Sequence, residues 1–226
     1  MFKPKISKEE LNEMPVVAFA GEITLVDNPE KAEKAILELQ KAGMVGVDTE
    51  TKPSFTRGTY HKVSLVQIST TEHCYLFRLN KMPFPPALGA FLASDSVMKI
   101  GLALRDDFAG LNRLYAFKPQ NFIDLQNIVK NYGILELGLQ KIFAIVFGRK
   151  ISKAQRLTNW ESAELTEQQQ IYAATDAWAS LLIYMQLQKE KKLTKKQVEK
   201  VVLEVLAQEE ELKQRRLIEK SQESNA

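Results

Sequence analysis

The order of its apolar segments predicts that this chain is an α/β domain with a five-stranded mixed central sheet and helices on both faces. Short β-rich runs come first, and strand and helix patterns then alternate, which is the order expected when helices pack on a mixed sheet. The chain has 226 residues, of which 45% are hydrophobic, enough to bury the core of one ordinary domain. Only 26% are charged, so wholesale disorder is not expected.

The first 19 residues are expected to form an N-terminal extension. Within it, residues 7–14 predict a short helix that begins with a capping box formed by Ser7 and Glu10. Residues 16–26 are apolar and rich in β-forming residues, which indicates one or two strands that lead into the main domain.

A helix is expected to begin at Asn28 and to end at Gly43. Asn28 is a favourable N-cap residue, and the proline after it suits the first helical position. The strands of the sheet are recognised as continuous apolar runs, the pattern of strands that are buried on both faces. The five expected strands are residues 44–49, 63–69, 74–79, 97–104 and 122–125.

Further helices are expected at residues 87–93, 106–117, 137–147 and 166–188. The last of these begins with a second capping box, Thr166 with Gln169. Gly148 should end the preceding helix, and residues 148–159 should form a basic loop. The main domain therefore covers residues 20–188.

Residues 189–226 are expected to form a charged C-terminal helix and a frayed tail that starts at Ser221. The apolar residues at helical spacing in this segment are Val198, Val201, Val205 and Leu212. They predict a solvated helix docked by one thin stripe, because two near-heptads are too few for a coiled coil.

Composition excludes several functional classes. The net charge of +3 permits a nucleic-acid partner but does not require one. Cys74 is the only cysteine, which excludes an intrachain disulfide and a cysteine-rich zinc site. No apolar run approaches the roughly 18–20 residues of a membrane span, and the N-terminus lacks the apolar core of a signal peptide. We therefore expect a cytoplasmic protein with no membrane partner, and the oligomeric state stays open.

Asp48 and Glu50 stand at the end of the first strand of the expected sheet. They are two residues apart on a strand, so their side chains leave the same face. Two carboxylates at so short a distance repel each other, and the pKa of one rises unless a cation lies between them. The pair is therefore a candidate ligand pair for Mg²⁺ or Mn²⁺. Taken alone, two strand-end acids that face water are the better interpretation.

Three later residues are candidates for the same site. Asp107 lies where a strand passes into a helix, and its alternative role is to cap and charge the helix start together with Asp106. Both roles are compatible, because capping by Asp106 would leave Asp107 free to face the strand ends. Tyr172 and Asp176 are four residues apart on a helix and share a face. The alternative for this pair is a half-buried tyrosine that is hydrogen-bonded to a helix acid.

Taken together, the four acids and the tyrosine resemble the DEDD superfamily of 3′–5′ exonucleases, in its tyrosine-bearing subclass. The resemblance covers about residues 20–188. In detail the chain looks closest to the Werner-type exonuclease branch, and it resembles ribonuclease D more distantly. The other segments that carry it are Leu65-Val66-Gln67-Ile68, Lys99-Ile100-Gly101, Thr158-Asn159-Trp160-Glu161 and Tyr172-Ala173-Ala174-Thr175-Asp176-Ala177.

This resemblance implies a ribonuclease H-like fold with two Mg²⁺ or Mn²⁺ ions and no small-molecule organic cofactor. It implies that Asp48, Glu50, Asp107 and Asp176 are the metal ligands and that Tyr172 positions the attacking water. Two cations about 3.5–4 Å apart can activate a water on one side of a phosphorus and stabilise the leaving oxygen on the other. An ordinary phenol has a pKa near 10, so the tyrosine should orient the water and not deprotonate it.

The resemblance also implies the reaction, which is hydrolysis of the terminal phosphodiester of a nucleic acid with release of nucleoside 5′-monophosphates. DNA is favoured as the substrate because the segment 158–177 looks closest to the Werner-type branch. One alternative is ribonuclease D-like trimming of RNA, although relatives of that type usually carry an extra helical domain, and the residues after Gln188 are too few for one. Another is a non-catalytic nucleic-acid-binding module, which should lack one or more of the acids.

Nucleic-acid contacts are expected in the loops beside the acids. Phe55 could stack on a terminal base, a contact worth ~1–3 kcal/mol where it occurs, or it could be an ordinary surface aromatic. The basic residues expected to contact phosphates are Arg57, Lys62, Arg149, Lys150, Lys153 and Arg156. Their alternative is a solvated basic surface. Neither His61 nor His73 has a partner at metal-ligand spacing.

Overall fold

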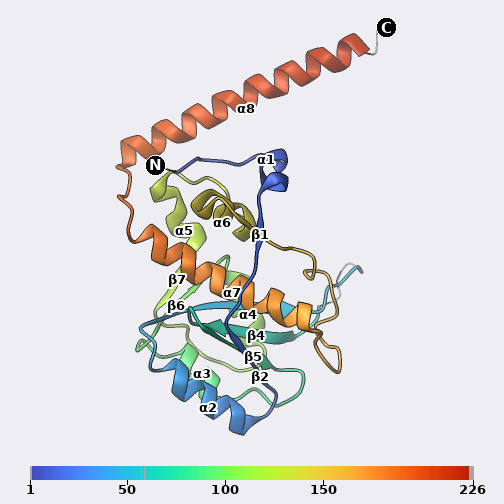
Figure 1. The fold of residues 1–226 in the computed structure, drawn as a ribbon, viewed down its shortest axis with the longest axis vertical. Helices are drawn as coiled ribbons and strands as arrows, with labels where there is room; N and C mark the ends of the chain where they lie inside the picture. Colours follow the sequence, from blue (N-terminus) through green and yellow to red (C-terminus); the bar gives the residue numbers. More distant parts are fainter. Residues whose placement is uncertain (1, 57, 59, 224–226) are drawn as a thin grey trace.

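A six-stranded mixed sheet forms the centre of the molecule in the computed structural model, which describes residues 2–56, 58 and 60–223 (Figure 1). Its strands are β2 (Glu22–Val26), β3 (Met44–Thr51), β4 (Val63–Ser69), β5 (His73–Arg78), β6 (Met98–Gly101) and β7 (Phe122–Asp124). They lie in the order β2-β5-β4-β3-β6-β7. β4 is antiparallel to both of its neighbours, and the other pairs are parallel. The expected mixed α/β fold is confirmed.

The expected number of five strands is wrong, because β2 adds a sixth strand at the edge of the sheet. It pairs in parallel with β5, from Glu22 opposite His73 to Val26 opposite Phe77. The sequence indicates a strand in this segment but not its partner, because parallel partners lie far apart in the chain.

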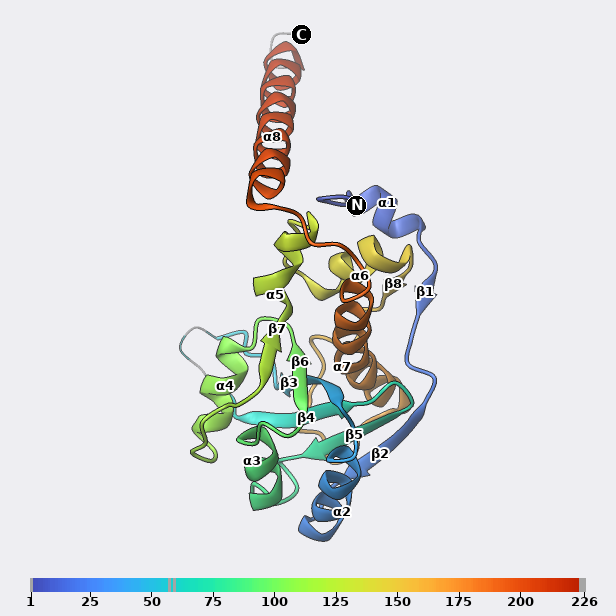
Figure 2. The same ribbon diagram turned by 90° about the vertical axis from the view of Figure 1, so that its left-hand side faces the viewer.

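The helices cover both faces of the sheet (Figures 1 and 2). They are α1 (Lys8–Glu13), α2 (Pro29–Leu39), α3 (Pro86–Leu92), α4 (Arg105–Asn112), α5 (Leu125–Ile128), the 3₁₀ helix η1 (Val129–Tyr132), α6 (Leu139–Phe147), α7 (Glu167–Leu187) and α8 (Lys195–Glu223). Val45 and Val47 of β3 belong to the core that also contains the apolar sides of α2 and α3. Gly46, which lies between them, faces the other side of the sheet, as the alternation along a strand requires, and it packs against α7.

Local sequence signals place the ends of several helices correctly. Both capping boxes form, Ser7 with Glu10 and Thr166 with Gln169. Gly148 ends α6 with a φ of 64°, a left-handed conformation that glycine adopts without strain. The helix expected at residues 106–117 is shorter than expected and stops at Asn112, whose side-chain oxygen accepts a hydrogen bond from the Phe117 amide at 3.0 Å.

The basic loop expected at residues 148–159 contains a short strand that the sequence does not indicate. This strand, β8 (Lys150–Ile151), pairs in parallel with β1 (Val16–Val17). Two-residue strands have no periodic pattern to detect, so their pairing depends on the fold that brings them together. The pairing ties the N-terminal segment to the loop that precedes α7.

The C-terminal helix α8 projects away from the rest of the molecule in both views (Figures 1 and 2). Val205 is buried, whereas the side chain of Leu212 is 54% exposed. The expected docking stripe therefore holds at Val205 and is wrong at Leu212, because the helix has passed the body of the domain by that point. The helix reaches Glu223, beyond the expected start of a frayed tail at Ser221, and residues 224–226 lie outside the described residues.

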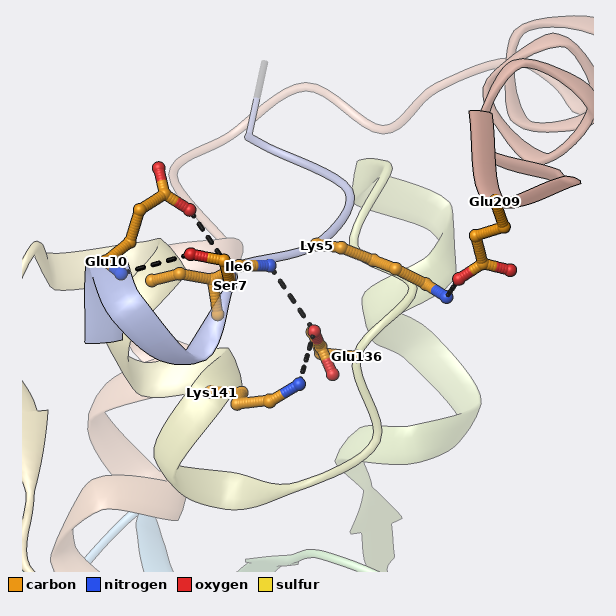
Figure 3. A network of polar contacts seen from close by, with 7 residues as sticks. All are labelled: Lys5, Ile6, Ser7, Glu10, Glu136, Lys141 and Glu209. Atoms are coloured by element: carbon orange, nitrogen blue, oxygen red, sulfur yellow. Dashed lines mark hydrogen bonds and ion pairs between the residues drawn. The ribbon is translucent and has the colours of Figure 1, made fainter. Parts of the chain in front are cut away.

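Polar contacts join the N-terminal segment to α8 and to the start of α6 (Figure 3). The Lys5 ammonium pairs with Glu209 of α8. The Ile6 amide donates to Glu136 Oε1 at 3.3 Å, and Lys141 Nζ donates to the same oxygen at 3.0 Å. Exposed ion pairs such as the first contribute at most about 1 kcal/mol. Every helix in the described residues is too short or too polar to span a bilayer.

Candidate active site

The packing of α7 on β3 creates the candidate site. A Cβ atom added to Gly46 would lie 1.9 Å from the carbonyl oxygen of Ala177, so the backbone of α7 rests directly on this strand. Asp48 and Glu50 follow on the same face of β3. The register between β3 and β4 shifts between Glu50 and Thr51, a bulge of the kind often found beside active sites.

Three carboxylates meet at this contact. Asp48, Glu50 and Asp176 each offer one oxygen, and these oxygens lie within 4.8 Å of one another; we call these three residues the acidic cluster. Tyr172 stands one turn before Asp176 on α7, and both are buried, at 7% and 8% exposure. The shared face expected for Asp48 and Glu50 on β3 and the one expected for Tyr172 and Asp176 on α7 therefore meet at one site.

Asp107 lies beside the acidic cluster, outside the group of oxygens within 4.8 Å. It occupies the first turn of α4, and its carboxylate accepts a hydrogen bond from the hydroxyl of Thr49. Its charge is one of the causes that raise the pKa of Asp48 and Glu50, after burial and the charge of Asp176.

The turn that places Asp107 is held by Asp124, a residue that the sequence does not single out. The two carboxylate oxygens of Asp124 accept hydrogen bonds from the amides of Ala103 and Leu104, at 2.9 and 3.0 Å. Ala103 is left-handed, with a φ of 58°, which is strained for a residue other than glycine. The suggestion that Asp106 caps α4 is wrong, because the N-cap residue is Leu104 and it has no side-chain cap.

Burial and mutual repulsion raise the pKa of these carboxyl groups. The pKa of Asp48 lies well above its ordinary value because of its burial and then the charges of Asp176, Asp107 and Glu50. Burial and the charges of Asp176 and Asp107 raise the pKa of Glu50 to about 9. Burial raises the pKa of Asp176 to about 7 and that of Asp107 to about 6. By themselves these groups cannot all be ionised at neutral pH.

The donor set suits a hard divalent cation. Within the described residues the acidic cluster offers only carboxylate oxygens, the ligands preferred by Mg²⁺, Mn²⁺ and Ca²⁺. A cation placed among them would remove the repulsion that raises their pKa values. The phenol of Tyr172 stays protonated, because burial and the neighbouring acids raise its pKa further above its ordinary value.

Two of the expected basic residues act on the cluster through their charge. Burial raises the pKa of both Glu50 and Asp176, and the charges of Arg156 and Lys153, respectively, offset part of that rise. Lys150 is turned away, since its ammonium donates to the Asn12 carbonyl at 2.7 Å. Lys62 and Arg149 are exposed, and Arg57 lies outside the described residues.

Two aromatic side chains stand out in the loop after β3. Phe55 is 84% exposed, which is compatible both with stacking on a base and with an ordinary surface aromatic. Tyr60 is 82% exposed, and the Arg113 guanidinium lies 5.7 Å from the centre of its ring. Tyr60 was not among the contacts expected from the sequence, although its position near Arg57 and Lys62 in the chain is a signal for stacking on a base.

Comparisons with known proteins agree with this geometry. The family model described as 3′–5′ exonuclease matches residues 23–192. The chain is 31% identical over 184 residues to the mouse "Bifunctional 3'-5' exonuclease/ATP-dependent helicase WRN", covering 77% of this chain and 13% of that protein. It is 32% identical over 170 residues to ribonuclease D of Haemophilus influenzae, covering 74% of this chain and 41% of that protein. The chain thus spans less than half the length of either relative.

The fold resembles that of a domain whose structure has been solved. The Nibbler EXO domain of Aedes aegypti superimposes with a TM-score of 0.70 and 23% sequence identity, over 77% of this chain and 92% of that domain. At this level of identity the likeness concerns the fold.

Proposed function

This chain belongs to the 3′–5′ exonuclease family, and we propose that it hydrolyses the terminal phosphodiester at the 3′ end of a nucleic acid, with DNA favoured over RNA. The observation that carries the proposal is the convergence of Asp48, Glu50 and Asp176 within 4.8 Å, with Tyr172 one turn away on the same helix. Each of these residues comes from a motif that the family resemblance had singled out.

The chain's own residues have distinct roles in this proposal. Asp48, Glu50 and Asp176 would hold Mg²⁺ or Mn²⁺, and Asp107 would complete the set from α4. Two such ions would activate a water and stabilise the leaving oxygen. Tyr172 orients that water as a neutral hydrogen-bond donor or acceptor.

Residues around the acidic cluster bind the nucleic-acid strand. Lys153 and Arg156 lie close enough to the acids to affect their pKa values, so they are suited to bind the phosphates next to the scissile bond. Phe55 and Tyr60 offer exposed rings for stacking on unpaired bases. None of these contacts selects a base, so the proposed binding is tolerant of sequence.

The preference for DNA is supported by the segment 158–177, which resembles the Werner-type branch. RNA trimming is the second candidate, supported by the 32% identity to a ribonuclease D. The discriminating group is the 2′-hydroxyl, which a protein can use to tell the two nucleic acids apart.

The test is hydrolysis of 3′-ended single strands of matched sequence, one DNA and one RNA, with Mg²⁺ or Mn²⁺. We expect nucleoside 5′-monophosphates to be released from the 3′ end, faster from DNA. Asp48→Ala should abolish the release and keep the fold, and the matched control Asp106→Ala, which removes an exposed acid, should retain it. Normal activity of the Asp48→Ala protein would refute the proposal, and faster release from RNA would reverse the choice of substrate.

The same assay tests the non-catalytic alternative. A binding module would retain the oligonucleotide without shortening it. Melting with and without millimolar Mn²⁺ adds a second criterion, because an ion bound only by the folded state must stabilise it.

A further inference from the structure

Gln67 is a fully buried amide without a hydrogen-bond partner in the part of the chain that the structure describes. Its side chain is 0% exposed, and within the described residues neither its Nε2 nor its Oε1 makes a hydrogen bond. Buried amides are nearly always paired, because an unpaired one loses its bonds to water without replacement. A methionine of similar size would avoid that penalty, so a purely structural role does not account for the amide.

The register of the sheet places Gln67 directly beside a residue of the acidic cluster. Gln67 lies opposite Asp48 on β3 and opposite Leu76 on β5. Residues that are directly opposite share a face, and their Cβ atoms are about 4.5–5.5 Å apart. The amide and the carboxylate therefore leave neighbouring backbones on the same side of the sheet.

This face is the one that α7 covers. Leu65 and Leu76, which flank Gln67 on β4 and β5, pack in one buried cluster with Tyr172 and Ala173 of α7. The amide is thus enclosed between the sheet and the turn of α7 that carries Tyr172, where water cannot satisfy it. Of the two residues paired with Gln67 across the sheet, Asp48 has a polar side chain, whereas Leu76 is apolar.

We propose that Gln67 is a positioning residue, whose amide nitrogen donates a hydrogen bond to the Asp48 carboxylate when divalent ions are bound. This inference rests on the proposed function. One oxygen of Asp48, Oδ1, already accepts from the Thr49 amide at 2.9 Å, and Gln67 would hold the carboxylate from the opposite side. Carboxylates that bind metals are usually held by such hydrogen bonds, and loss of one typically weakens metal affinity or activity about 10–100-fold.

The test compares the wild-type chain with Gln67→Met and with the control Leu76→Met. The control repacks the same apolar surroundings on the side away from Asp48. Without divalent ions, Gln67→Met should melt at or above the temperature of the wild type, because an unpaired amide is gone. With Mn²⁺ its melting temperature should rise less than that of the wild type, and kcat should fall about 10–100-fold, with partial recovery at higher Mn²⁺. Leu76→Met should behave as the wild type in the last two measurements.

Two outcomes with these variants would overturn the inference. One is a Gln67→Met protein with the Mn²⁺ response and kcat of the wild type. The other is a Gln67→Met protein that melts far below the wild type without divalent ions, since the amide would then serve the metal-free fold.

A Mn²⁺-soaked crystal of the wild type gives an independent answer. Gln67 Nε2 within about 3.2 Å of an Asp48 carboxylate oxygen supports the inference, and a separation beyond hydrogen-bond distance overturns it. Wild-type hydrolysis in the same assay separates the two proposals. If the wild type is inactive, the proposed function fails, whereas an active wild type with an unaffected Gln67→Met protein removes only the role of Gln67.

Discussion

The hydroxyl of Thr49 donates a hydrogen bond to the carboxylate of Asp107. Thr49 lies between Asp48 and Glu50 on β3, and its side chain leaves the opposite face of the strand. The central residue of the Asp-x-Glu segment therefore links the strand that carries two acids to the helix that carries another. Through this bond the strand controls where Asp107 lies relative to the acidic cluster.

Replacing Thr49 by valine should lower the rate of hydrolysis about 10–100-fold, the usual effect of losing a hydrogen bond to a metal-binding carboxylate. Valine has the shape of threonine and favours strands, so the fold should persist. Thr49→Ser keeps a hydroxyl and is the matched control. Steady-state kinetics on the labelled oligonucleotide measure the effect, and equal rates for the valine and serine variants would contradict it.

Replacing Tyr172 by phenylalanine should reduce the single-turnover rate by about 10²-fold, the loss typical when a reacting group is no longer held in position. The ring should stay packed beside Trp160, whose centroid is 6.0 Å away. Stabilisation by Mn²⁺ should be unchanged, because the phenol is not a proposed ligand. Tyr132→Phe removes a buried phenol from η1 and should leave the rate alone. A Tyr172→Phe protein that loses its Mn²⁺ response would make the phenol part of the metal site instead.

Replacing Gly46 by alanine should destabilise the fold by about 1–3 kcal/mol or more, the range for overpacked cores. The new Cβ would meet the backbone of Ala177 at 1.9 Å, and a backbone carbonyl cannot move aside as a flexible side chain can. Displacement of α7 should also lower activity, since Tyr172 and Asp176 move with it. Gly43→Ala, which meets nothing within 4 Å, is the control in urea unfolding. Equal stability of the two variants would show that α7 can shift without penalty.

Lys99 is a buried cation without a carboxylate partner at salt-bridge distance in the described part of the chain. Its ammonium donates to the carbonyl oxygens of Phe91, Ser94 and Val97, at 3.3, 2.7 and 2.9 Å. It also lies 5.2 Å from the ring centres of both Phe91 and Phe122. Burial nevertheless lowers the pKa of Lys99 to about 8.

This shift predicts how stability changes with pH. Between pH 8 and the ordinary lysine value of 10.5, the unfolded chain binds more protons than the folded one, so the free energy of unfolding rises with pH. The free energy of unfolding of the wild type minus that of Lys99→Met should therefore increase from pH 8 to pH 10. Below about pH 7 this difference should not change with pH. Urea unfolding of both proteins at these pH values cancels the other titrations. A flat difference across the whole range would contradict the lowered pKa.

Signals within a few residues predicted much of this architecture. The capping boxes at Ser7 and Thr166 form as their spacing indicates, because the groups involved are neighbours in the chain. The spacing of Asp48 and Glu50 on a strand, and of Tyr172 and Asp176 on a helix, likewise set the faces that these residues share. Their shared order also led to the family, whose model matches residues 23–192.

Contacts between segments that are far apart in the chain could not be predicted from such local signals. Three contacts join residues that are far apart in the sequence. They are the pairing of β2 with β5, the hydrogen bond from Lys150 to the Asn12 carbonyl, and the hydrogen bonds from the amides before α4 to Asp124. Nothing in the local pattern of Gln67 distinguishes a satisfied amide from an unpaired one.

The sequence by itself determined the kinds of element, the residues with metal-binding chemistry and the family, because these depend on side-chain type and short spacing. Only the tertiary structure decided that three acids meet within 4.8 Å while Asp107 is held by Thr49. It alone decided that Gln67 and Lys99 are buried. The physical reason is that distances between elements follow from how closely backbones pack, as α7 does on Gly46, and that packing is a property of the whole core.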